Sequence, residues 1–337
     1  MKPVYIHSNV SISAQNTFEE GFKEVKELKF TENTQVKAFK INYKDFLPPA
    51  ASRRMATGVK MGVVAAKKAI QQAELDTVDA IITGTGLGCV EDSEKFLNAV
   101  IDNDEQFLTP TSFIQSTHNT VAAQIALSIK NKGYNMTYVN GANSFEAALL
   151  DGMLMLNEEN ETVLVGGVDE LGKKFVNEYE KIYQQEVSFS EGANFFVLGA
   201  QKKENSIAKL VSVEIFQNIE EDKISNKVIS FLEDNSLKVS DVDAIILGAN
   251  GDAFDSYYQK IQSELFDNTT QLKYKNLSGE FFTASAFGFY VATKLFEKEE
   301  IPTSCFLNSI RKAEYKTILL YNQYLGKQHS LVLLTLC

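Results

Sequence analysis

Val78-Asp79-Ala80-Ile81-Ile82-Thr83-Gly84 reappears as Val242-Asp243-Ala244-Ile245-Ile246-Leu247-Gly248, 164 residues further along the chain. Both segments are short, β-branched runs that end in glycine, which is typical of a buried strand in an α/β protein. A charged helical stretch precedes each run and a glycine-containing loop follows it. The sequence therefore predicts an internal duplication of two α/β halves.

The rest of the chain fits this interpretation. Thr162–Val165 is a third clear strand, and apolar residues at helical spacing predict a helix from about Ser52 to about Gln72. No low-complexity segment separates the halves. We place the join near Gln201–Ser206, which gives an N-terminal half of residues 1–203 and a C-terminal half of residues 204–337.

Composition narrows the class of protein. The 337 residues are 44% hydrophobic and 23% charged, enough for a large core. The formal net charge of −11 argues against binding to nucleic acid or to anionic membranes. Without a signal peptide or an apolar run of about 18 residues, the expected location is the cytoplasm. The three cysteines are far apart, which fits a reducing compartment, and we expect no metal and no cofactor.

The motifs in the sequence do not form any known set of catalytic residues. Gly84-Thr85-Gly86-Leu87-Gly88 follows a strand, but its spacing differs from that of dinucleotide-binding loops, so we interpret it as a tight turn. The chain has no GxSxG serine elbow and no phosphate-binding loop. His118 is the histidine that lies among polar residues, and a hydrogen-bonded structural role is the default for it.

Four segments, in order, resemble the β-ketoacyl synthases of fatty-acid and polyketide assembly. Ser52–Met55 with Gly84–Gly88 resembles the opening region, and Leu108–Ala123 resembles the dimer contact and pocket wall. Tyr138–Ser144 resembles the nucleophile turn and is followed by Val163–Glu170, which resembles a strand ending in AGG(A/S)E. Ser190–Ala193 resembles the family's GEGA. The resemblance implies a thiolase fold, an α/β fold with five αβαβα layers made from two similar halves.

The resemblance also implies that the catalytic residues are replaced. The family's cysteine falls on Ala142, and its two histidines fall on Asn250 and Glu280. Alanine cannot form a thioester, asparagine is not a base, and glutamate repels an enolate. We therefore expect no condensing activity. The implied role is that of a chain-length factor, a partner that shapes the product tunnel of an active ketosynthase, and the segment Ser116–Thr120 looks most like proteins of aryl-polyene and flexirubin pigment clusters.

Further site residues follow from the same resemblance. We expect Phe113, His118, Asn143, Phe145 and Tyr324 to contact substrate, with Tyr324 in the place of a gating phenylalanine. Arg53 and Arg54 match the place where the family docks an acidic acyl carrier protein. The expected partner is an active ketosynthase, bound through Leu108–Val121 and Asn135–Val139.

Two alternatives remain open at this stage. In the first, Glu280 is the general base of a hydrolase or lyase acting on carrier-bound acyl chains, with Asn250 and Asn143 as hydrogen-bond donors. In the second, the chain is a purely structural paralogue that forms a homodimer.

Overall fold

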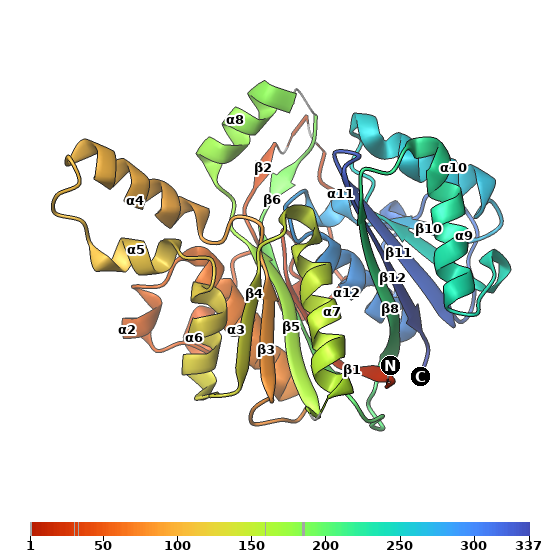
Figure 1. Ribbon diagram of the computed structural model, residues 1–337, viewed down its shortest axis with the longest axis horizontal. Coiled ribbons are helices and arrows are strands. Elements are labelled where there is room, and N and C mark those ends of the chain that lie inside the picture. The colour runs from red at the N-terminus through yellow and green to blue at the C-terminus, as the bar shows by residue number, and fades with distance from the viewer. Residues whose placement is uncertain (1, 30, 33, 159, 184–185) are drawn as a thin grey trace.

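A computed structural model describes residues 2–29, 31–32, 34–158, 160–183 and 186–337. Its centre is a sheet of ten strands in the order β10-β9-β11-β12-β8-β1-β7-β5-β3-β4 (Figure 1). The first half contributes β1 (Val4–Ile12), β3 (Ala80–Gly84), β4 (Tyr134–Tyr138), β5 (Thr162–Asp169) and β7 (Gly192–Gly199). The second half contributes β8 (Ala208–Gln217), β9 (Ala244–Leu247), β10 (Thr270–Lys273), β11 (Thr317–Tyr324) and β12 (Gln328–Thr335).

The two halves have the same topology. In each, the five strands lie in space in the order third, second, fourth, fifth, first of their half. In each, the second strand is parallel to its two neighbours, and the fifth strand is antiparallel to the fourth and the first. The first strands, β1 and β8, pair antiparallel at the centre, from Val4 opposite Leu210 to Ile6 opposite Ala208. The predicted duplication is confirmed, and the proposed join at 203/204 falls between β7 and β8.

The repeated aspartate makes the same contacts in both halves. Asp79 Oδ2 accepts the backbone N–H groups of Glu161 and Thr162, where β5 begins. Asp243 Oδ2 accepts those of Lys316 and Thr317, where β11 begins. Each aspartate therefore fixes the start of the fourth strand of its half, which gives the sequence repeat a physical reason.

Helices cover both faces of each half-sheet and create the five layers. The outer faces of the halves are covered by α3 (Thr57–Gln72) with α6 (Thr120–Ile129), and by α9 (Ile224–Asp234) with α10 (Ser256–Glu264). Between the halves lie α7 (Ser144–Asn157) and α12 (Ser285–Phe296). Strand residues alternate accordingly: Ala80 and Ile82 face the central layer, and Ile81 faces α3. This arrangement is the expected thiolase fold.

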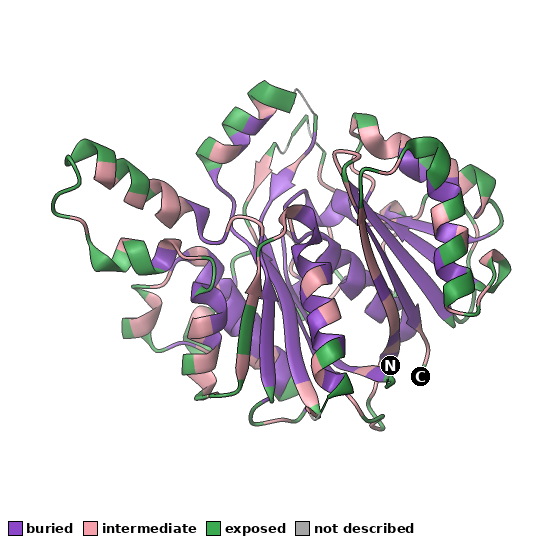
Figure 2. Ribbon diagram, viewed as in Figure 1, coloured by how far each residue is buried: buried purple, intermediate pink, exposed green. Residues whose placement is uncertain are grey.

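An arm projects from the first half. It consists of α4 (Val90–Asp102) and α5 (Pro110–Ser116), which extend away from the sheet beside α6 (Figure 1). The arm is largely exposed, in contrast to the buried strands (Figure 2). A second projection carries α8 (Lys173–Tyr183) and the small sheet of β2 (Gln35–Val36) and β6 (Phe189–Ser190). The remaining short helices are α1 (Thr17–Glu20), α2 (Pro49–Ser52) and α11 (Lys275–Ser278).

The first long helix begins later than predicted. Ser52 ends α2, and α3 starts at Thr57 and ends at Gln72. The two residues at its start donate their backbone N–H groups to distant side chains, Ala56 to Gln115 Oε1 at 3.1 Å and Thr57 to Glu170 Oε1 at 3.1 Å. The helix is therefore capped by the tertiary structure and not by Ser52.

None of the helices in the described part of the chain combines the length and the apolar composition that crossing a bilayer requires.

Candidate functional site

The turn that resembles the nucleophile turn is closed by a side chain of the second half. It runs from Asn140 through the short 3-10 helix Gly141–Asn143 into α7, and Ala142 is 2% exposed. The backbone N–H of Ala142 donates to Gln328 Oε1 at 2.9 Å. Gln328 Nε2 donates in turn to the carbonyl oxygen of Asn140 at 3.1 Å. Ala142 thus makes its polar contact with β12 and not with Asn250 or Glu280.

The same strand holds the first turn of α7. Ser330 donates its hydroxyl to Glu146 Oε1 at 2.9 Å, and burial raises the pKa of Glu146. Asn143 is 1% exposed, and both polar atoms of its side chain lack a hydrogen-bond partner among the described residues. Asn143 does not bond to Glu280. Of the two amide donors expected for a Glu280 base, Asn143 and Asn250, only Asn250 therefore donates a hydrogen bond to it.

Asn250 and Glu280 are brought together, and a lysine joins them. Asn250 Nδ2 donates to Glu280 Oε2 at 2.7 Å, and Lys275 Nζ lies 2.8 Å from the same oxygen. The lysine and glutamate side chains are only 2% and 5% exposed. Burial raises the pKa of Glu280, while the Lys275 ammonium and the Asn250 amide oppose that rise. Glu280 is therefore part of a buried ion pair with Lys275, and Asn250, the other position predicted to replace a histidine, is hydrogen-bonded to it.

Glu280 lies between two cavities. A small, mainly apolar cavity of about 30 Å³ lies on one side, and its lining includes Leu87, Phe175, Phe282 and Tyr324. A polar cavity of about 260 Å³ lies on the other, and its lining includes Asn250, Lys275, Asn276 and Ser188. The apolar cavity is too small for an acyl chain because aromatic rings fill it: the centroids of Phe282 and Tyr324 are 5.3 Å apart.

A buried carboxylate ties the glycine loop to the segment before α12. Asp169 Oδ1 accepts hydrogen bonds from the Thr85 hydroxyl and from the backbone N–H groups of Gly86 and Leu87. Asp169 Oδ2 accepts two from Thr283, through its backbone N–H and its hydroxyl. A Cβ on Gly86 would lie 2.3 Å from Phe282. Gly86 is needed for close packing, in agreement with the tight turn expected from the sequence.

Glu170 and Glu191, from the segments Val163–Glu170 and Ser190–Ala193, also accept hydrogen bonds from backbone N–H groups. Glu170 accepts the N–H groups of Thr57 and Glu91, and burial with the nearby Glu91 charge raises the pKa of Glu170 to about 7. Glu191 accepts the N–H groups of Ala38 and Leu171. These carboxylates position loops around the site, which is a structural use of the residues.

The other predicted substrate-binding residues lie in different environments. Phe145 is fully buried in the central layer, where its ring centroid is 5.6 Å from that of Phe289 and 5.8 Å from that of Phe196. Phe113 is 54% exposed on the arm, next to Phe96. His118 is exposed between α5 and α6, beside Gly88. Tyr324 is the one predicted contact that lines a cavity together with Glu280, and the substrate roles of all five residues stay predictions.

Arg53 and Arg54 are exposed in the connection between α2 and α3. Their position on the surface is compatible with the docking role, which also stays a prediction.

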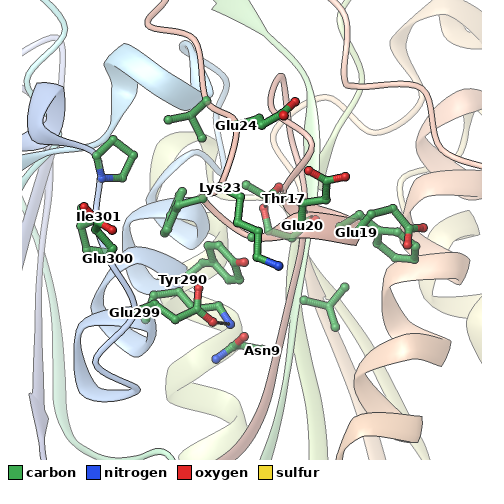
Figure 3. Close-up of a pocket in the computed structure, with 18 of the residues that line it drawn as sticks. Asn9, Thr17, Glu19, Glu20, Lys23, Glu24, Tyr290, Glu299, Glu300 and Ile301 are labelled. Atoms are coloured by element: carbon green, nitrogen blue, oxygen red, sulfur yellow. Dashed lines mark hydrogen bonds and ion pairs between the residues drawn. The ribbon is translucent and has the colours of Figure 1, made fainter.

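A larger cavity, of about 1020 Å³, lies away from the replaced residues. Figure 3 shows Glu19, Glu20 and Glu24 on one side of its opening, Glu299 and Glu300 on the other, and Lys23 between them in this view. Deeper in, Asn9 Nδ2 donates to Glu297 Oε2 at 2.9 Å. Its lining includes neither Ala142 nor Asn250 nor Glu280, so this cavity does not belong to the candidate site.

Two residues of the site were missed from the sequence. Lys275 could have been found, because it lies one helical turn before the Gly279-Glu280 pair on which the interpretation already rested. Gln328 carried no local signal, since its partner Ala142 is 186 residues away in the chain. Among the residues that the structure describes, no group of three or more His, Cys, Asp and Glu side chains could hold a metal ion.

Comparison with known proteins agrees with the fold. Solved structures with the same fold include a β-ketoacyl synthase from Burkholderia phymatum STM815, at 14% identity and a TM-score of 0.82 with all of both chains covered. The ishigamide ketosynthase/chain length factor has 16% identity and a TM-score of 0.79, covering 100% of this chain and 99% of that one. A ketosynthase in complex with its chain length factor from Xenorhabdus doucetiae has 12% identity and a TM-score of 0.79, with coverage of 100% and 98%.

Curated protein sequences give no significant match. The family model of the β-ketoacyl synthase N-terminal domain matches residues 25–213, more than half of the chain. Together with the fold, this match shows that the chain belongs to the β-ketoacyl synthase family.

Proposed function

We propose that this chain is a non-catalytic partner subunit of an active ketosynthase and helps to form the tunnel in which the product grows. The observation that carries the proposal is the combination of a closed catalytic turn with an open apolar face. The turn offers alanine in place of a nucleophile, and its N–H is already bonded to Gln328. A chain that keeps the fold but not the chemistry is suited to a partner role.

The apolar face extends from the edge strand β4 over α6 to the arm. Its exposed side chains come from the arm, α6, β4 and the residue after β4: Leu97, Ile101, Phe107, Phe113, Ile114, Leu127, Met136 and Val139. Phe107 is 89% exposed and Leu127 is 70% exposed. An apolar surface of this kind beside a free strand edge marks an interaction site.

The two edges of the sheet differ. The outer edge of β10 is covered, because Leu272 bridges to Phe306 and Leu307 N–H donates to the Gln271 carbonyl at 2.9 Å. The outer edge of β4 is unpaired within the described residues. We infer that β4 pairs with the corresponding strand of a second thiolase-fold subunit about a two-fold axis. The interface would include the predicted segments Leu108–Val121 and Asn135–Val139.

The chemistry around Glu280 favours this role over the hydrolase or lyase alternative. Burial raises the pKa of Glu280, which alone would suit a general base, but Lys275 and Asn250 both bond to the same carboxylate oxygen and stabilise its charged form. The polar cavity beside Glu280 has room for a small ligand, so the enzyme hypothesis is tested directly. Turnover of acyl thioesters by the isolated chain, abolished in Glu280→Gln, would establish an enzyme and overturn the partner assignment.

The partner assignment is tested by binding. The chain is produced with an active ketosynthase from the same genome, and complex formation is measured by size-exclusion chromatography with light scattering. Leu127→Lys and Val139→Lys should weaken the complex at least 10-fold. Ile182→Lys, on α8 and 70% exposed, is the matched control and should leave it unchanged. A chain that pairs with itself alone would favour the homodimeric paralogue.

The tunnel role is tested by product length. Phe113 lies on the exposed arm, so in a complex its ring would contact the partner and not the chain's own core. Phe113→Ala should lengthen the product of the assembled pair by one or more two-carbon units. Unchanged product length in an active pair would remove the tunnel role and leave a scaffold.

A further part of the proposal concerns docking of the acyl carrier protein. Charge reversal at Arg53 and Arg54 should weaken binding of an acidic acyl carrier protein to the assembled pair, because both side chains are exposed. Unchanged carrier binding would refute that role.

We further propose an aryl-polyene or flexirubin type of pathway in the cytoplasm. A neighbouring gene for a ketosynthase with an intact cysteine and two histidines, accompanied by carrier and dehydratase genes, would support it.

A further inference from the structure

We propose that the turn Asn140–Ala142 is a binding site for a primary carboxamide, and that Gln328 of the same chain fills this site. The turn offers one donor, the Ala142 N–H, and one acceptor, the Asn140 carbonyl. A primary carboxamide offers the complementary pair, a carbonyl oxygen and an NH₂ group. Gln328 makes both bonds, at 2.9 and 3.1 Å.

The fit between the turn and the side chain is close. Gly141 has φ +54°, and a Cβ built on it would lie 2.6 Å from Gln328 Oε1. The carboxamide therefore lies directly against the turn backbone, and Ala142 is 2% exposed beneath it. Any other ligand for the Ala142 N–H would first have to displace Gln328.

The residue type matches the site. The partners fix the orientation of the amide, because exchanging its oxygen and nitrogen would place two donors together at Ala142 and two acceptors together at Asn140. A glutamate could accept from Ala142 but would turn a charged oxygen toward the Asn140 carbonyl. A methionine could make neither bond. Glutamine satisfies both groups of the turn.

The side chain is presented on a rigid element. Gln328 is the first residue of β12 and lies between Tyr324 of β11 and Gln217 of β8. The hairpin turn before it has positive φ at Leu325 and Gly326, and the Gly326 N–H donates to Gln323 Oε1 at 2.8 Å. The carboxamide is thus preorganised, and it competes with external ligands at a high effective concentration.

This inference deepens the proposed function, on which it rests for its biological meaning: the position where a catalytic relative holds an acyl group is here occupied from within. The experiment below uses the isolated chain. It can therefore fail while partner binding succeeds, or succeed while partner binding fails.

The first test is the accessibility of a thiol at position 142. Ala142→Cys is made in a Cys337→Ser background, because Cys337 is exposed and Cys89 and Cys305 are buried. Labelling by N-ethylmaleimide, which carries no primary carboxamide, followed by intact mass, should be at least 10-fold faster in Ala142→Cys/Gln328→Ala than in Ala142→Cys. Propionamide, which carries the missing carboxamide, should slow labelling of the double variant. Ala142→Cys/Gln323→Ala is the matched control, since it loosens the same hairpin but keeps Gln328, and it should label as slowly as Ala142→Cys.

The second measurement does not require a cysteine. Hydrogen exchange of the Ala142 amide should be at least 10-fold faster in Gln328→Ala and in Gln328→Met than in the unmodified chain. Faster labelling or faster exchange supports the carboxamide site when propionamide slows labelling of the double variant, and labelling that propionamide does not slow would overturn it. Equal labelling rates together with equal exchange would overturn it.

Discussion

The buried pair of Lys275 and Glu280 makes a quantitative prediction. With Nζ and Oε2 2.8 Å apart, their attraction is about 6 kcal/mol at an effective dielectric constant of about 20. Taking each ion out of water costs several kcal/mol, so the intact pair contributes little net stability. Removing one partner leaves the other charge buried. Lys275→Met and Glu280→Gln should therefore each lower the free energy of unfolding by about 3–5 kcal/mol.

The double variant separates this mechanism from simple loss of packing. Lys275→Met/Glu280→Gln has no buried charge at the site, so it should lie within about 2 kcal/mol of the unmodified chain. Lys273→Met is the matched control. Lys273 is 30% exposed and lies 3.7 Å from Glu27, so its loss should cost less than about 1 kcal/mol.

Urea unfolding followed by circular dichroism gives the midpoints for all four variants. The pH dependence provides a second check. In Lys275→Met the pKa of Glu280 rises further, so the folded state binds a proton that the unfolded state releases. The loss of stability should then be larger at pH 8 than at pH 5. A coupling energy below about 1 kcal/mol, or a loss that does not change with pH, would refute the assignment of a charged buried pair.

Three other substitutions test the packing and the electrostatics described above. Glu146→Gln keeps an acceptor for Ser330 and removes a carboxyl whose pKa burial raises. Its stability relative to the unmodified chain should therefore be more favourable at pH 8 than near pH 5, and a difference that does not change with pH would contradict this. Phe145→Ala should cost about 3–5 kcal/mol in a urea titration because the ring is fully buried, whereas Phe113→Ala, on the exposed arm, should cost less than about 1 kcal/mol. Gly86→Ala should lower the free energy of unfolding by about 1–3 kcal/mol because its Cβ would clash with Phe282. Gly58→Ala in α3 is the control: its Cβ would lie 3.4 Å from the nearest atom, Cys89 Sγ, so it should be neutral or stabilising in thermal unfolding.

The fold could be predicted because its strongest signals are local. The repeated strand needs only its own apolar residues and the aspartate before it, and the second copy forms β9, Ala244–Leu247, within the repeated run. The start of α3 could not be predicted in the same way. The groups that cap it, Gln115 and Glu170, are 59 and 113 residues away from the N–H groups they accept.

The site was partly predictable for a related reason. The replaced positions Ala142, Asn250 and Glu280 stand at motif positions that a sequence displays directly. Their contacts depend on the packing of one half against the other, and Gln328, which bonds to Ala142, lies 186 residues further along the chain. Phe145 shows the limit of residue type as evidence, because a bulky aromatic beside a turn can fill the core as well as line a cavity.

The central position of β1 also determines the order in which the protein can be completed during synthesis. Tyr5 of β1 pairs with Gly199 of β7, and the other neighbour of β1 is β8, which begins at Ala208. At roughly 5–20 residues per second, the ribosome needs about 10–40 s to make those partners after it has made β1. The first strand therefore waits, unpaired and rich in apolar side chains, until nearly 200 residues have followed it. A nascent chain that stops before β7 lacks both neighbours of β1, so the apolar side chains of β1 remain without their strand partners while translation proceeds.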